Sequence, residues 1–120
     1  MSKSIIRGGG VTRRTTTRAN AARLDHLIDE ATVDAYNESE QAIGLFTMME
    51  EHLAVPFTTT VLGVGVTVER IDITGADTIV AVCRRGRARL RVPILDLALP
   101  SPTPTGAEWI DAYRRWIAGG

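Results

Sequence analysis

The spacing of apolar residues in this chain changes at Pro56. Before Pro56, apolar side chains recur every three or four positions, which is the period of an amphipathic helix. From there to residue 97, segments rich in Val, Ile and Thr alternate apolar and polar positions, as half-buried strands do. A chain of 120 residues has room for one core that both parts share. The pattern therefore predicts a single α+β domain.

Two short helices are predicted before Pro56. The first begins near Ala21 and ends near Tyr36. The second starts after Asn37, which has the form of an N-cap, with Glu40 three positions later reaching back to it. One continuous helix is the alternative. The apolar stripes are Leu24, Leu27, Ile28, Ala31 and Ala35 in the first helix and Ala42, Phe46, Met49 and Leu53 in the second.

Four or five short strands are predicted after Pro56, in residues 57–62, 64–73, 78–84 and 87–94. Glycines at 63, 75 and 86 mark the tight turns between them. Such strands suggest a small antiparallel sheet that curls into an SH3-like sheet or barrel. The helical segment should pack on this sheet.

A third, C-terminal amphipathic helix should close the domain. Thr105 and Glu108 have the spacing of a capping box, and Trp109 and Trp116 lie on the apolar stripe that follows. We expect both tryptophans to pack on the sheet as core and not to form an exposed groove for a partner.

Charge is segregated along the chain although the formal net charge is zero. Residues 1–24 carry basic side chains and no acid, and residues 25–53 carry eight acids and no Lys or Arg. Gathering that much like charge costs free energy in a compact state, so we expect a cation or a basic surface nearby. The acids are Asp25, Asp29, Glu30, Asp34, Glu38, Glu40, Glu50 and Glu51.

Residues 1–20 are predicted to form a disordered basic tail before a single domain at 21–120, because their Gly and Thr runs have no helical or strand period. Cys83 is the lone cysteine and has no partner for a disulfide. The apolar runs are too short for a membrane span or a secretion signal. These features predict a cytoplasmic protein.

No catalytic set is recognisable, so we expect a protein that is not an enzyme. His26 and His52 stand in no spacing typical of a metal triad or of a general base with an orienting partner. Cys83 falls in a predicted strand and should face the core.

Metal binding through oxygen ligands is the chemistry that the acidic block favours. Calcium takes six to eight oxygens from carboxylates, backbone carbonyls and water. The segment from Asp34 to Glu40 combines close carboxylates with the carbonyls of a predicted helix end, where the helix dipole also favours a cation. It is not an EF-hand, because Leu45 stands where the bidentate Glu is required. The alternative is a solvated acidic face that binds nothing specifically.

The residues Val33-Asp34-Ala35-Tyr36, the acids Glu38 and Glu40, Gly44, Glu50-Glu51 and Pro56-Phe57, with the sheet that follows, resemble the bacterial non-EF-hand calcium-binding proteins typified by cyanobacterial CcbP. The resemblance covers about residues 24–97. It implies Ca²⁺ binding, as a buffer or sensor, on a compact α/β domain without catalysis. The acidic positions that match the family are Asp34, Glu38, Glu50 and Glu51, and the Asp34–Glu40 segment adds Glu40 to the predicted metal-binding residues.

A basic hairpin around Gly86 supports two rival interpretations. Its arginines could bind nucleic acid through phosphates, or they could lie against the acidic helices and neutralise them. We favour the second, because no aromatic residue interleaves with them to stack on bases. A structural or protein-binding module built on the terminal helix is a third possibility. The arginines are Arg84, Arg85, Arg87, Arg89 and Arg91.

Overall fold

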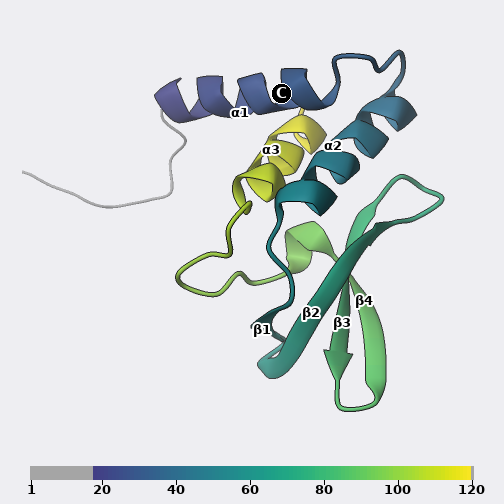
Figure 1. Cartoon of the computed structure of the whole chain (residues 1–120), viewed down its shortest axis with the longest axis vertical. Helices are drawn as coiled ribbons and strands as arrows, with labels where there is room; N and C mark the ends of the chain where they lie inside the picture. The colour runs from purple at the N-terminus through teal and green to yellow at the C-terminus, as the bar shows by residue number, and fades with distance from the viewer. Residues whose placement is uncertain (1–17, 120) are drawn as a thin grey trace, which may run out of the picture.

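The computed structural model describes residues 18–119, so all but the last three residues of the predicted tail lie outside the described residues. Three helices gather at one end of the molecule and a sheet forms the other (Figure 1). This arrangement confirms the predicted α+β class. The helices are α1 (Arg18–Ala31), α2 (Glu38–His52) and α3 (Glu108–Ile117); the strands are β1 (Phe57–Val61), β2 (Val64–Ile73), β3 (Ile79–Arg85) and β4 (Ala88–Pro93), followed by the short 3₁₀ helix η2 (Ile94–Asp96). Within residues 18–119, no helix is both long and apolar enough to cross a membrane.

Helix α1 ends at Ala31, so the predicted end near Tyr36 was wrong. The backbone N–H of Thr32 and its hydroxyl both donate to the carbonyl of Ile28, at 3.0 and 2.7 Å, and the N–H of Ala35 donates to the carbonyl of Thr32. A threonine that bonds back to the preceding turn competes with helix propagation. Residues 32–37 are therefore a connector between two helices, and the single continuous helix is excluded.

Helix α2 begins at Glu38, directly after the predicted Asn37 cap. The N–H of Glu40 donates to Asn37 Oδ1 at 2.9 Å. The carboxylate of Glu40 reaches back one residue further than expected and accepts from the N–H of Tyr36 at 2.6 Å. Together the two bonds fix the connector against the first turn of α2.

The sheet is an open antiparallel meander of order β1-β2-β3-β4, and the SH3-like curl stays a prediction. A β-bulge at Glu69 interrupts the pairing of β2 with β3. The extra residue shifts the inward positions, so that Val66 and Val68 face the core before it and Ile71 after it. The bulge thereby keeps the apolar side of a bent strand on the core.

The core lies between the sheet and the helices. Leu45 and Met49 of α2 are fully buried, and α3 contributes Trp109 and Ile110. Trp109 is core as predicted, whereas Trp116 is half-buried at the core's edge. Helix α1 packs mainly on α3, with α2 beside it.

The predicted capping box of α3 was wrong. No side-chain hydrogen bond caps this helix, and Ala107 occupies the N-cap position. The turn before it is held by Gly106, at φ 89°, whose Cα lies so close to the His52 carbonyl that an added Cβ would be 2.1 Å from that oxygen. The carbonyl of Thr105 also accepts from the N–H of Ala54. Backbone contact with the end of α2 thus sets the start of α3.

Gly44→Ala should destabilise the domain by about 1–3 kcal/mol, the usual range for overpacking. A Cβ built on Gly44 lies 2.2 Å from the Ala31 carbonyl oxygen, so α1 and α2 must separate. At a solvent-exposed position within a helix, the same change would stabilise the folded state by about 1 kcal/mol. Urea unfolding measures the sign. Gly75→Ala is the matched control, since an added Cβ there meets nothing within 4 Å. Equal or higher stability of Gly44→Ala would contradict the close approach of the helices.

Candidate metal site

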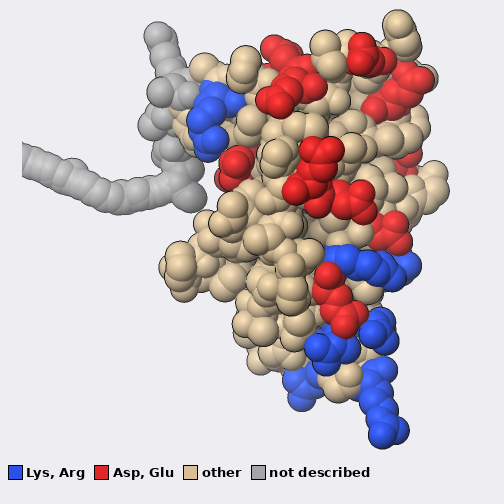
Figure 2. Space-filling model, viewed as in Figure 1, with Lys and Arg blue, Asp and Glu red and all other residues tan. Residues whose placement is uncertain are grey.

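The acidic block lies on the helical end of the molecule and is largely without basic partners. Asp25 pairs with Arg115 of α3, whose Nε and Nη2 donate to its carboxylate at 2.7 and 3.1 Å. This hydrogen-bonded pair lowers the pKa of Asp25. Among the side chains that the structure describes, those of residues 20–119, no Lys or Arg forms an ion pair with the other seven acids. Red side chains accordingly gather over the helices in Figure 2.

The hairpin arginines do not supply the missing positive charge, so the prediction that they lie against the acidic helices was wrong. Arg84 and Arg89 both donate to the carboxylate of Glu69, at 2.7 and 2.9 Å, and Arg91 donates to Asp72 at 2.9 Å. The bulge places Glu69 beside Arg84 and Arg89, which are paired across β3 and β4. Hydrogen bonds from Arg89 and Arg84 lower the pKa of Glu69. Three of the five hairpin arginines are therefore engaged by carboxylates of the sheet itself.

Asp34 and Glu40 line the same small hollow, of about 270 Å³, between the connector and α2. Its other lining residues are Ala31, Val33, Ala35, Ile43 and Gly44. The C-terminal end of α1, with the carbonyl of Ala31, reaches Gly44 here. Since the last carbonyls of a helix carry its negative partial charge, this hollow combines two carboxylates with a backbone region that favours a cation.

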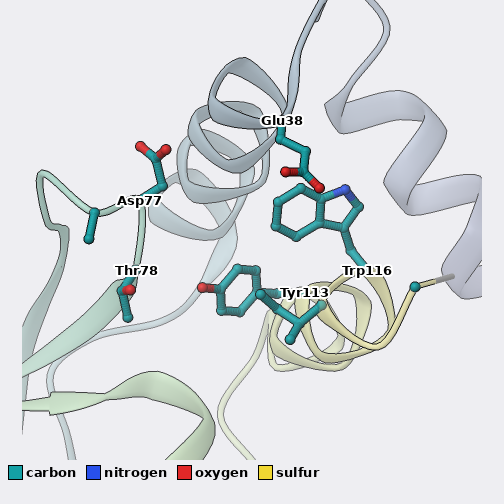
Figure 3. A pocket seen from close by; sticks show the side chains of 8 residues that line it. Glu38, Asp77, Thr78, Tyr113 and Trp116 are labelled. Atoms are coloured by element: carbon teal, nitrogen blue, oxygen red, sulfur yellow. The ribbon is translucent and has the colours of Figure 1, made fainter.

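The remaining predicted ligands lie elsewhere. Glu38 lines a different and larger hollow, of about 550 Å³, together with Asp77 of the β2–β3 turn (Figure 3). Glu50 and Glu51 belong to the last turn of α2. Ten residues of helix separate Glu40 from Glu50, which is about 15 Å. The structure thus distributes the five predicted ligands over three places.

Asp77 is a residue that the sequence motifs did not single out. It stands far from Glu38 in the sequence, and only the packing of the β2–β3 turn near α2 and α3 brings the two carboxylates to one hollow. The sequence indicates that Asp77 lies in a turn, but no pattern in it indicates that Glu38 lies near Asp77.

Between residues 18 and 119, no group of three or more His, Cys, Asp or Glu side chains is arranged to hold a metal ion. An ion in the Asp34–Glu40 hollow would need further oxygen ligands from backbone carbonyls and water. Carboxylate and carbonyl oxygens suit a hard cation such as Ca²⁺, and the hollow has no His or Cys for a softer metal. The oxygen atoms available in this hollow are therefore of the type that calcium prefers.

Cys83 and His52 belong to residue types that are often used in catalysis, but both make structural contacts here. Cys83 is buried in β3, and burial raises the pKa of its thiol, which keeps it protonated and unreactive. The ring of His52 stacks on Trp109 with a centroid distance of 5.7 Å.

Comparison with known proteins agrees with this donor chemistry. The family model named for CcbP and described as "Calcium binding" matches residues 25–117. The crystal structure of Anabaena CcbP superposes with a TM-score of 0.69 at 18% sequence identity, over 81% of this chain and 90% of that one. At that identity the structural likeness shows the shared fold alone. No curated protein matches the chain.

The Glu69 cluster predicts how stability depends on pH. The folded carboxylate has the lower pKa, so in acid the unfolded chain binds more protons and folding stability falls as pH decreases from about 5 to about 3. Glu69→Gln should lower the thermal midpoint at pH 7, and its difference from the parent should shrink as the pH falls through this range. Thermal melts at a series of pH values measure this. Glu50→Gln is the control, since no ion pair to Glu50 is found in residues 18–119. If the difference in thermal midpoint between the parent and Glu69→Gln is the same at every pH, the ionised Glu69 carboxylate does not stabilise the fold.

Proposed function

The chain belongs to the CcbP family of calcium-binding proteins, and we propose that Asp34 and Glu40 are the carboxylate ligands of its calcium. The observation that carries this proposal is that the two acids line one hollow at the C-terminal end of α1. Neither forms an ion pair with a Lys or Arg of the described chain. A bound cation would relieve the repulsion of the surrounding acids.

The two carboxylates stand on different elements, which gives calcium a structural effect. Asp34 belongs to the connector and Glu40 to the first turn of α2. One oxygen of Glu40 accepts from Tyr36, so its other oxygen is the one free to bind an ion. Calcium held between them would tie the connector to α2 and stabilise the folded state by mass action.

The other predicted ligands have lesser roles in this proposal. Glu38 contributes negative potential from the next hollow, and Glu50 and Glu51 form a second, weaker site or none. Two carboxylates supplemented by carbonyls and water are not a preformed cage, so we expect a dissociation constant of roughly 10⁻⁶ to 10⁻⁴ M. That range suits a cytoplasmic sensor or a low-affinity buffer better than a tight store. The protein acts by binding and not by catalysis.

Titration calorimetry on metal-free protein tests the assignment. Asp34→Asn and Glu40→Gln each remove one charge at nearly constant shape, and in Glu40→Gln the new amide oxygen can still accept from the N–H of Tyr36. Each change should weaken calcium binding about tenfold or more and should reduce the rise of the thermal midpoint with calcium. Glu50→Gln is the matched control at the far end of α2 and should bind like the parent. Unchanged affinity in Asp34→Asn and Glu40→Gln, with calcium still binding, would move the site elsewhere.

Nucleic-acid binding by the basic hairpin is the second candidate. In its favour, Arg85 and Arg87 form no ion pair within residues 18–119, and basic side chains gather toward the end of the sheet far from the helices (Figure 2). Against it, Glu69 and Asp72 already engage Arg84, Arg89 and Arg91.

A salt titration separates the two functions. If the hairpin binds phosphates, affinity for a DNA or RNA oligonucleotide should fall steeply with salt, and Arg85→Ala with Arg87→Ala should abolish it. We expect instead no binding at physiological salt, measured by fluorescence anisotropy of a labelled oligonucleotide. Calcium binding by the same double variant should equal that of the parent.

A further inference from the structure

The larger hollow lies where three elements meet, namely the start of α2, the β2–β3 turn and the end of α3 (Figure 3). Its volume of about 550 Å³ is in the range of small-molecule pockets. Its wall includes Glu38, Asp77, Thr78, Tyr113, Trp116 and Ile117.

Two aromatic rings of α3 form one side of this pocket and are held in place. Tyr113 and Trp116 stack with a centroid distance of 6.1 Å and an interplanar angle of 21°. The indole N–H of Trp116 donates to Gln41 of α2 at 2.9 Å, and the hydroxyl of Tyr113 accepts from the N–H of Ile79 at 3.3 Å. These bonds preorganise an aromatic surface before any ligand arrives.

Two carboxylates supply the charge of the pocket. Glu38 lies beside the Trp116 indole and Asp77 lies across the hollow from it, next to Thr78 (Figure 3). No Lys or Arg is among the lining residues. The face of an indole ring attracts cations. A carboxylate beside the ring adds its own attraction for the same cation. Charge and ring therefore select the same kind of ligand.

The hydroxyl of Tyr113 adds a polar group to the wall of the pocket. The tyrosine is only 3% exposed and lines the hollow, and Figure 3 shows its hydroxyl directed toward Thr78. It accepts one hydrogen bond from Ile79, but within residues 18–119 no acceptor receives its own proton. Its own proton can be donated to an oxygen of a ligand in the pocket or to water.

We propose that this pocket binds an organic cation, a protonated amine or guanidinium carried on an apolar stem. A metal ion is a poorer occupant, because Glu38 and Asp77 stand on opposite sides of this hollow and the aromatic rings of Tyr113 and Trp116 line its wall (Figure 3). The cation is either a free small amine or the basic side chain of a partner protein. This site is separate from the Asp34–Glu40 hollow, so neither proposal depends on the other.

The indole N–H signals of the full-length protein in a ¹H–¹⁵N NMR spectrum provide the test. The chain has two tryptophans: Trp116 lines the pocket, whereas Trp109 is 4% exposed and packs on His52. Spermidine and N-acetyl-arginine amide should shift the Trp116 signal and leave the Trp109 signal in place. N-acetyl-citrulline amide has nearly the same shape without the charge and should bind at least tenfold more weakly. A Trp116→Phe variant assigns the signals.

Charge variants complete the experiment. Asp77→Asn introduces a residue type that tolerates the φ of 64° found here, and Glu38→Gln keeps the length of its side chain. The two changes together should weaken binding of the cationic probes about tenfold, whereas Glu50→Gln should have no effect. A stronger response to N-acetyl-arginine amide than to spermidine identifies a protein side chain as the ligand, and the reverse identifies a free amine. Equal binding of the citrulline probe, or a Trp116 shift caused by calcium and not by the amines, would overturn the proposal.

Discussion

The pairing of Glu69 with Arg84 and Arg89 determines how charge is distributed over the whole molecule. The bulge in β2 brings one carboxylate within hydrogen-bond distance of two guanidinium groups on neighbouring strands. Because these arginines are engaged on the sheet, they cannot neutralise the acids of α1 and α2. The helical end keeps its excess negative charge, and a cation becomes the natural partner for it.

The first turn of α2 is the place where the two hollows meet. Glu38 and Glu40 are two residues apart, and two residues turn a helix by about 200°, so their side chains leave on opposite sides. Glu40 faces the connector after α1, whereas Glu38 faces Asp77 and the aromatic rings of α3. The Asn37 cap fixes this turn and thereby positions both carboxylates. An ion bound in one hollow would change the affinity of the other hollow for a cation only through the charge and rigidity of this turn.

The fold is shared with a protein of only 18% sequence identity, which is understandable from what holds the chain together. The core consists of apolar residues that other apolar residues of similar volume can replace. Backbone approaches are less replaceable. Gly44 lets α2 contact the end of α1, and Gly106 lets the start of α3 contact the end of α2. These two contacts, together with the packing of α1 on α3, hold the three helices at one end of the sheet.

Local patterns were sufficient to determine much of this protein. The strand boundaries at Phe57, Val64 and Ile73, the Asn37 cap and the burial of Trp109 follow from alternation, turn residues and helical spacing, all of which act over a few neighbouring residues. The end of α1 did not follow, because Thr32 bonds back to Ile28 where apolar spacing alone would continue the helix. The start of α3 did not follow either, since it depends on a backbone contact between Gly106 and His52.

The candidate sites needed the tertiary structure. From the sequence, Asp34, Glu38 and Glu40 form one cluster, and the arginines near Gly86 are the obvious counter-charge for it. The fold instead separates Glu38 from Asp34, joins it with Asp77, and matches the arginines with Glu69 and Asp72. Acidic composition alone indicated a cation or a basic surface nearby, because like charges repel wherever they lie. Which carboxylates share a hollow depends on the direction of each side chain and on contacts between distant segments, and only the folded chain decides these.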